Sequence, residues 1–212
     1  MTKILITGFD AFGGAAINPT AEIIKELEGE VIAGAELVVC RVPVVRYDSL
    51  KTVMDAISEY QPDAVVCLGQ AAGRKGVTPE RVAINLDDFR IPDNAGHQVI
   101  DEPVVQGAPA AYFSTLPIKA MVRDMTEAGI EASVSESAGT FVCNHLFYAL
   151  QHALNGTGIR NGFVHVPLLP EQAKDNSYPS MPLDMMTEAV RVMVKTLQTV
   201  QGDISVTGGK IC

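Results

Sequence analysis

Short apolar runs that end at glycine alternate along this chain with stretches of helical periodicity. Residues 3–7 end at Gly8 and precede a helical pattern over residues 20–27, while residues 64–68 end in the same way at Gly69. Further strand patterns cover residues 36–44, 132–135 and 162–166, and further helical patterns cover residues 47–60, 116–128, 142–154 and 183–198. Continuous apolar strands separated by helices are typical of a parallel sheet that is buried on both faces. The sequence therefore predicts an α/β fold, a three-layer α/β/α sandwich built on a mostly parallel, twisted sheet.

Residues 81–86 follow a different pattern, in which apolar and polar side chains alternate. Alternation with a period of two indicates a strand with one exposed face, so this segment predicts an antiparallel portion at the edge of the sheet. Sites on parallel sheets form beyond the carboxyl ends of the strands. Because Gly8, Gly69 and His165 all stand at predicted strand ends, we expect these segments to meet on one rim.

The bulk composition indicates a globular domain and excludes several classes of partner. The 212 residues fit a single domain, residues 1–212, and 47% apolar with 19% charged residues is ordinary for a globular protein. A net charge of −9 without a basic cluster excludes nucleic acid and anionic membranes as partners. No apolar run approaches the roughly 20 residues of a membrane span, and the first is too short for a signal peptide. The four cysteines are scattered without disulfide-scaffold or zinc-knuckle spacing, which predicts a cytoplasmic chain with reduced thiols.

Cys143 is the candidate nucleophile. A loop rich in serine, glycine and threonine at residues 135–140 runs into a helical pattern, so the thiol is expected in the first turn of a helix. Unpaired backbone N–H groups and the helix dipole stabilise a thiolate at that position. The alternative is a buried cysteine that acts as a small hydrophobe, but other side chains of this helix already supply its apolar stripe. Cys40 and Cys67 lie inside apolar strand patterns, and the terminal Cys212 is expected to have no role.

His165 is the candidate base, because it stands near the end of the strand pattern over residues 162–166. A histidine in a strand is more often a satisfied core residue, and His97, His145 and His152 compete for the role. The choice among them rests on the position of His165 at the point where the chain must leave the sheet.

Glu80 is the candidate for the group that orients the imidazole. By two-residue parity it shares the apolar face of the strand pattern over residues 81–86, where a carboxylate needs a partner such as an imidazole. The alternative is an exposed position at the start of that strand. Asp87 and Asp88 are further candidates for the orienting group.

The glycine-rich segment at residues 8–14 is not a phosphate loop, because it lacks the lysine and the glycine spacing of nucleotide-binding motifs. Phe9 and Phe12 suit the walls of a pocket for a flat, uncharged ligand, although burial in the core is an equally simple explanation. Arg90 could stabilise a developing oxyanion or pair with a nearby aspartate. Cys143 and His145 alone make a poor zinc site, so the sequence predicts no metal and no cofactor.

Four segments are distinctive in combination. They are GFDAFGG at residues 8–14 with Asn18-Pro19 after it, PERVAIN at residues 79–85, SAGTFVCNH at residues 137–145 and HVPLLPEQ at residues 165–172. Together they resemble the pyrrolidone-carboxylate peptidase (pyroglutamyl peptidase I) family. The resemblance spans nearly the whole chain, and the segments around the cysteine and the glutamate are long and specific.

The resemblance implies a cysteine peptidase that removes an N-terminal pyroglutamyl residue from peptides. Cys143 matches the nucleophile of the family, His165 its base and Glu80 the third member of its triad. Further matches imply a lactam pocket lined by Phe9, Phe12, Phe141 and Val142, polar contacts from Asn18 and Gln70, and Arg90 close to the reacting carbonyl. Leu168 stands where an aromatic residue is frequent in the family. The family is cytoplasmic and often homotetrameric, and the resemblance implies the same here.

Two other functions stay open on the sequence. A nucleoside phosphorylase-like enzyme would use a similar three-layer sheet without a nucleophilic cysteine, and its turnover would depend on phosphate and survive thiol alkylation. A redox sensor would use a Cys143 of low pKa without His165, and it would have no peptidase activity.

Overall fold

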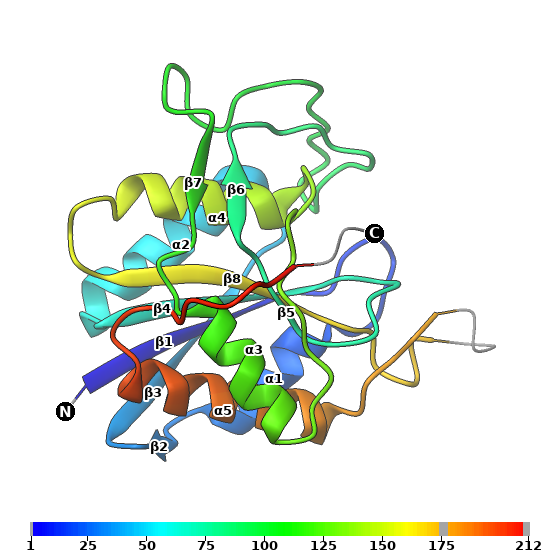
Figure 1. Ribbon diagram of the computed structural model, residues 1–212. Helices are drawn as coiled ribbons and strands as arrows, with labels where there is room; N and C mark the ends of the chain where they lie inside the picture. Colours follow the sequence, from blue (N-terminus) through cyan, green and yellow to red (C-terminus); the bar gives the residue numbers. More distant parts are fainter. Residues whose placement is uncertain (1, 174–177, 210–212) are drawn as a thin grey trace.

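A computed structural model describes residues 2–173 and 178–209, so Cys212 lies outside the described residues. The helices are α1 (Pro19–Leu27), α2 (Arg46–Tyr60), α3 (Ile118–Glu127), α4 (Val142–Ala153) and α5 (Leu183–Thr199) (Figure 1). The strands are β1 (Thr2–Phe9), β2 (Val31–Ile32), β3 (Ala35–Val42), β4 (Ala64–Gln70), β5 (Thr78–Pro79), β6 (Val82–Ile84), β7 (Ala111–Phe113) and β8 (Arg160–Val166). Across the described ranges, none of the helices combines the length and the apolar character that a membrane span needs.

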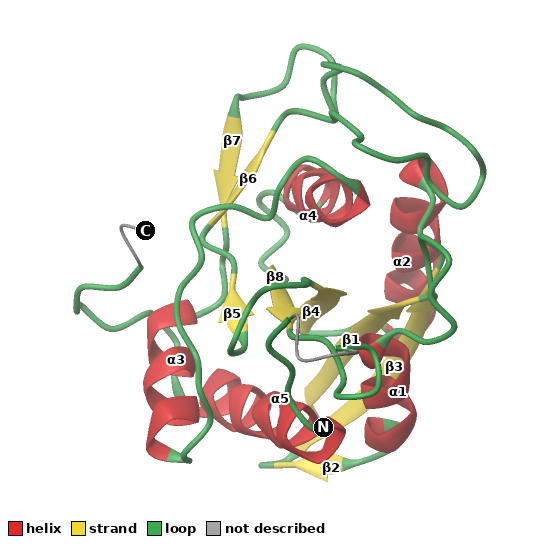
Figure 2. Ribbon diagram, turned by 90° about the vertical axis from the view of Figure 1, so that its right-hand side faces the viewer, coloured by secondary structure: helices red, strands yellow, loops and turns green. Residues whose placement is uncertain are grey.

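One sheet of 6 strands, in the order β2-β3-β1-β4-β8-β5, forms the middle layer. Its inner pairs β3–β1, β1–β4 and β4–β8 are parallel, and the short strands β2 and β5 add antiparallel edges. Helices α2 and α4 cover one face, and α1, α3 and α5 cover the other (Figures 1 and 2). Successive side chains of β1 point to opposite faces of the sheet, so Ile4 and Ile6 pack in one hydrophobic core and Leu5 in the other. The predicted three-layer sandwich is confirmed.

The antiparallel edges of the main sheet are β2 and β5, and the prediction that residues 81–86 form such an edge is wrong. Only the middle of that segment forms a strand, β6, which pairs with β7 in a separate sheet of 2 strands. The predicted strand over residues 132–135 is reduced to isolated bridges, Val77 with Ala132 and Glu80 with Ser135. A period of two identifies an extended segment, but its partner depends on packing that is distant in the sequence.

Gly8 lies where β1 passes the first turn of α1. Asn18 caps this helix, because its Oδ1 accepts a hydrogen bond from the Thr20 N–H at 3.0 Å. The Thr20 hydroxyl oxygen in turn accepts from the Phe9 N–H at 2.8 Å. A methyl group at Gly8 would overlap the backbone carbonyl of Thr20.

We therefore expect Gly8→Ala to lower the free energy of unfolding by about 1–3 kcal/mol or more, measured by urea denaturation. The overlap involves backbone on both sides, so a side-chain rotation cannot relieve it. Gly202→Ala is the control, since nothing lies within 4 Å of a Cβ there. Equal stability of the two variants would contradict the close approach of β1 and α1.

Candidate active site

Cys143 is the second residue of α4, which confirms its predicted place in the first turn of a helix. The helix begins directly after Phe141, which makes no side-chain capping bond, so its first backbone N–H groups stay available. A Cβ built on Gly69 of β4 would lie 3.1 Å from Cys143 Sγ and 2.6 Å from Cε1 of Phe163. The sulfur thus lies against the backbone of β4, in space that any other residue at position 69 would fill.

His165 and Glu80 reach the same place from β8 and β5. His165 pairs in register with Gly69, the residue beneath the sulfur. Its Nδ1 lies 2.7 Å from Glu80 Oε1, and both side chains are buried. The backbone N–H of Glu80 donates to the Phe163 carbonyl at 2.8 Å, which holds the glutamate beside β8 although it follows the end of β5. A thiol, an imidazole and a carboxylate therefore come together on the rim where β4 and β8 end.

The charges of the imidazole and the carboxylate follow from burial and from Arg74. Burial opposes ionisation of Glu80, but the hydrogen bond from His165 and the charges of His165 and Arg74 outweigh it, so the carboxyl pKa lies below its ordinary value. Burial lowers the pKa of His165 and outweighs the opposite effect of Glu80. Because the guanidinium is permanently charged, we assign an ionised Glu80 beside a neutral His165 at neutral pH. His165 Nδ1–H then donates to Glu80, and Nε2 carries the lone pair that a base requires.

The prediction that α4 stabilises a thiolate is wrong for the free protein. Burial raises the pKa of the Cys143 thiol to about 12, and the charge of Glu80 acts in the same direction. Arg74 opposes this shift without reversing it. A helix N-terminus contributes only a partial charge, which does not offset removal of the sulfur from water. Cys143 therefore keeps its proton until a base removes it.

Arg74 is a residue of the site that the sequence analysis missed. Its Nη1 lies 2.8 Å from Glu80 Oε1, the same oxygen that faces His165. Arg74 lies in the loop between β4 and β5, where no periodicity or motif distinguishes it from Lys75 beside it. Only the fold shows which of the two cations turns towards the carboxylate.

A second buried pair of a histidine and a carboxylate lies on the other side of α4. His145 Nδ1 lies 2.7 Å from Asp87 Oδ2, and this oxygen also accepts from Arg46 Nε at 2.8 Å. His145 follows Cys143 by two positions, so its side chain projects about 200° away around the helix axis. This direction excludes His145 as the base for the thiol. Asp87, one of the alternative candidates for the orienting group, is paired with His145 and not with His165.

A small pocket opens beside the sulfur of Cys143. Its lining consists of Phe9, Phe12, Asn18, Val44, Gln70, Phe141 and Cys143. The centroids of the Phe12 and Phe141 rings lie 6.0 Å apart. Apart from Val44, which lies outside the recognisable motifs, each lining side chain belongs to the predicted site. The pocket is thus mainly aromatic, with two amide side chains as its polar groups.

The two amides are held in place by hydrogen bonds. Asn18 caps α1 with its Oδ1, and its Nδ2 donates to the Asp10 carbonyl at 2.9 Å. Gln70 Oε1 accepts from Gln172 Nε2 at 2.9 Å. Because these bonds fix the orientation of both amides, the polar groups of the pocket are arranged before any ligand enters.

Three other predicted residues lie outside the lining of this pocket. Val142 is fully buried in the core between α4 and the sheet, and Arg90 is exposed. Leu168 lines a wider pocket of about 640 Å³ that shares Gln70 with the smaller one. The substrate contacts that the resemblance implies for Val142 and Arg90 stay predictions.

Cys40 and Cys67 are the other free thiols in the described ranges. Burial raises the pKa of Cys40 to about 11 and that of Cys67 to about 12. Both lie in strands, as the sequence predicted. Within residues 2–173 and 178–209, no group of three or more histidine, cysteine, aspartate or glutamate side chains could hold a metal ion.

The fold and the rim define a three-layer α/β protein with a thiol, an imidazole and a carboxylate at its strand ends. A family model described as pyroglutamyl peptidase matches residues 2–200. Pyrrolidone-carboxylate peptidases of Vibrio parahaemolyticus and Aliivibrio fischeri are 56% and 57% identical to the chain over 212 residues, with 100% of each chain covered. The crystal structure of pyroglutamyl peptidase I from Bacillus amyloliquefaciens matches with a TM-score of 0.94 and 47% identity, over 97% of this chain and 99% of that one. The chain belongs to the pyroglutamyl peptidase family.

Proposed function

We propose that this protein is a cysteine peptidase that hydrolyses the bond after an N-terminal pyroglutamyl residue, with Cys143, His165 and Glu80 as its catalytic triad. One observation carries the proposal. The Glu80–His165 pair, joined at 2.7 Å, stands in register beside Gly69, against which the Cys143 sulfur lies. A base that is oriented by a carboxylate and lies next to a thiol is the arrangement that activates a nucleophile. Membership of the pyroglutamyl peptidase family supports the choice of substrate.

The reaction starts from a neutral thiol and a neutral imidazole. His165 Nε2 takes the thiol proton as Sγ attacks the carbonyl carbon that joins pyroglutamate to the next residue. The C–N bond then breaks, and the imidazolium gives this proton to the leaving amine. A thioester remains on Cys143. His165 next removes a proton from water, the resulting hydroxide attacks the thioester, and free pyroglutamate leaves while the thiol regains its proton.

Glu80 stabilises the imidazolium that exists between these proton transfers. Its carboxylate already accepts the Nδ1–H, so no side chain must move when the positive charge develops. The backbone N–H groups at the start of α4 stabilise the oxyanion in the same way. A donor of this kind contributes roughly 3–4 kcal/mol of transition-state stabilisation in comparable sites.

The lining of the pocket beside Cys143 matches the uncharged lactam ring of pyroglutamate in chemical character, and because the cavity volume is only about 10 Å³, the aromatic side chains must move apart to admit the ring. Phe9, Phe12 and Phe141 enclose the pocket, and no charged side chain is among its lining residues. Asn18 and Gln70 are the side chains that can bond the ring N–H and C=O. Homotetrameric assembly and a cytoplasmic location belong to the same proposal and rest on the family resemblance.

The proposal is tested by comparing a pyroglutamyl amide with the corresponding prolyl amide. Proline has a ring of the same size but lacks the ring carbonyl, and its ring nitrogen is a charged amine. A pocket that binds the lactam through hydrogen bonds is expected to favour the pyroglutamyl compound by about 10⁴-fold in kcat/KM. Comparable turnover of both amides would contradict the substrate assignment, and turnover of neither would contradict the peptidase assignment.

A further inference from the structure

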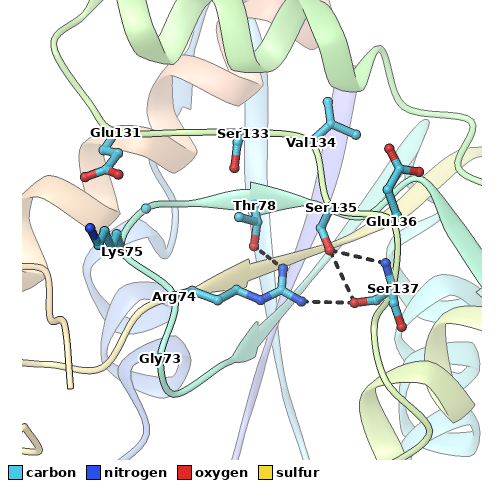
Figure 3. Close-up of a pocket in the computed structure, with 11 residues that line it drawn as sticks. Gly73, Arg74, Lys75, Thr78, Glu131, Ser133, Val134, Ser135, Glu136 and Ser137 are labelled. Carbon is cyan, nitrogen blue, oxygen red and sulfur yellow. Dashed lines mark hydrogen bonds between the residues drawn. The ribbon is translucent and has the colours of Figure 1, made fainter. Parts of the chain in front are cut away.

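Arg74 contacts the same oxygen of Glu80 that His165 contacts. Its guanidinium lies between the loop before β5 and the segment over residues 131–137, at the wall of a pocket of about 640 Å³ (Figure 3). Nη1 lies 2.8 Å from Glu80 Oε1 and also donates to the Thr78 hydroxyl. Nη2 donates to the Ser137 carbonyl at 3.0 Å. One side chain therefore connects the carboxylate to the neighbouring residue Thr78 and to Ser137, which is distant in the sequence.

The charge of Arg74 compensates the buried negative charge of Glu80. Glu80 is 0% exposed, and an isolated buried carboxylate costs several kcal/mol unless a cation pairs with it. His165 cannot be that cation in the resting site, because a base must be neutral. Among the described residues, Arg74 is the one permanent cation within 4.0 Å of the carboxylate, and it keeps its charge at any working pH.

Fork geometry explains why arginine suits this position better than lysine. The guanidinium forms an ion pair with the carboxylate through Nη1, which also donates to the Thr78 hydroxyl, and it donates to the Ser137 carbonyl from Nη2. A lysine ammonium is a point charge on a flexible stem and would not hold the ion pair and the two hydrogen bonds in one fixed arrangement. The Arg74 side chain is 24% exposed, so it reaches solvent on the pocket side while its partner is buried.

We propose that Arg74 is a positioning residue of the proposed reaction, which holds the Glu80 carboxylate ionised and directed at His165 Nδ1. The inference rests on the proposed function of the triad. Arg74 contacts Glu80 and is not among the lining residues of the lactam pocket, so it acts through the carboxylate. Among the described residues, the Cys143 thiol is a titratable group that interacts with the Glu80 charge, and the Cys67 thiol interacts with Cys143. Both keep their protons, because burial raises the pKa of each to about 12.

The test is the pH profile of Arg74→Gln. Loss of the guanidinium leaves the carboxylate uncompensated, so the Glu80–His165 pair takes up its first proton at higher pH. We expect the acid limb of the kcat/KM profile for a pyroglutamyl amide to move up by about one pH unit. At neutral pH kcat is expected to fall by roughly 10-fold or more, with KM nearly unchanged. Lys75→Gln is the matched control, since it removes the same charge from the neighbouring, exposed position and should leave both quantities as in the wild type.

A second readout separates this inference from the proposed function. The imidazole NMR signals of His165, assigned by their loss in His165→Asn, report the titration of the pair whether or not the protein hydrolyses a substrate. A wild-type titration in folded Arg74→Gln overturns the role of Arg74, even if the protein is an active peptidase. If Arg74→Gln does not fold, Arg74→Lys replaces it. There we expect an unmoved acid limb with a kcat reduced several-fold, and an unchanged kcat would overturn the positioning role.

Discussion

Cys143→Ser is expected to lower turnover of a pyroglutamyl amide by at least about 10³-fold, to the level that binding and the oxyanion site alone supply. The hydroxyl has nearly the shape of the thiol, so melting temperature and circular dichroism should match the wild type. Its proton is harder to remove, and the site already disfavours an anion, because burial raises the pKa of the thiol to about 12. Single-turnover and steady-state assays of the purified variant measure the effect.

Cys40→Ser is the matched control for this substitution. Cys40 is a free, half-buried thiol in β3, away from the His165–Glu80 pair, so its variant should keep wild-type turnover. Trapping of an acyl-enzyme should distinguish the two variants in the same way. We expect a mass increase of one pyroglutamyl group in Cys40→Ser and none in Cys143→Ser. Substantial turnover by folded Cys143→Ser would refute the nucleophile assignment.

Glu80→Gln is expected to reduce kcat by about 10³- to 10⁴-fold with little change in KM. An amide N–H pointed at His165 Nδ1 would force the ring proton onto Nε2, the nitrogen that must accept the thiol proton. The neutral amide also cannot stabilise the imidazolium that forms during attack. Steady-state kinetics at saturating substrate measures kcat. KM should change little, because Glu80 does not line the lactam pocket.

Glu136→Gln is the control for Glu80→Gln. Glu136 is an exposed carboxylate that pairs with Arg81 at 2.8 Å and lines the pocket beside Arg74, so the substitution removes an equal charge without reaching His165. We expect wild-type kcat from this variant. If Glu80→Gln retained more than about a tenth of the wild-type kcat, the carboxylate would not be the group that selects the tautomer of His165.

The main elements of the fold follow from local patterns. The two runs of five residues that end at glycine, residues 3–7 and 64–68, predict buried strands, because the helical stretches between the strands leave both faces of the sheet covered. Pairing was harder to predict. The segment over residues 81–86 has the period of an edge strand, yet β5 takes that edge, since the chain leaves the main sheet after Glu80.

The candidate site divides in the same way between local and distant causes. Cys143 in a first helical turn and His165 at a strand end are local features, and both stand where the sequence places them. Arg74 and Val44 carry no local signal, because their roles depend on which loops the fold brings together. The protonation state of the Cys143 thiol also cannot be predicted from local sequence. A helix N-terminus favours the anion, but the burial that outweighs it depends on the whole fold.

The bare backbone of Gly69 beneath the sulfur has a consequence for motion. The sulfur rests on β4, and the imidazole belongs to β8, and each of these strands is hydrogen-bonded to a neighbour on both sides. Amides in such strands exchange with solvent only when the domain opens globally, whereas loops and edges open by small fluctuations. Small fluctuations of the loops and edges can therefore admit a peptide or release a product without separating the Cys143 sulfur from the His165 imidazole. Heating should abolish turnover only when the domain unfolds cooperatively.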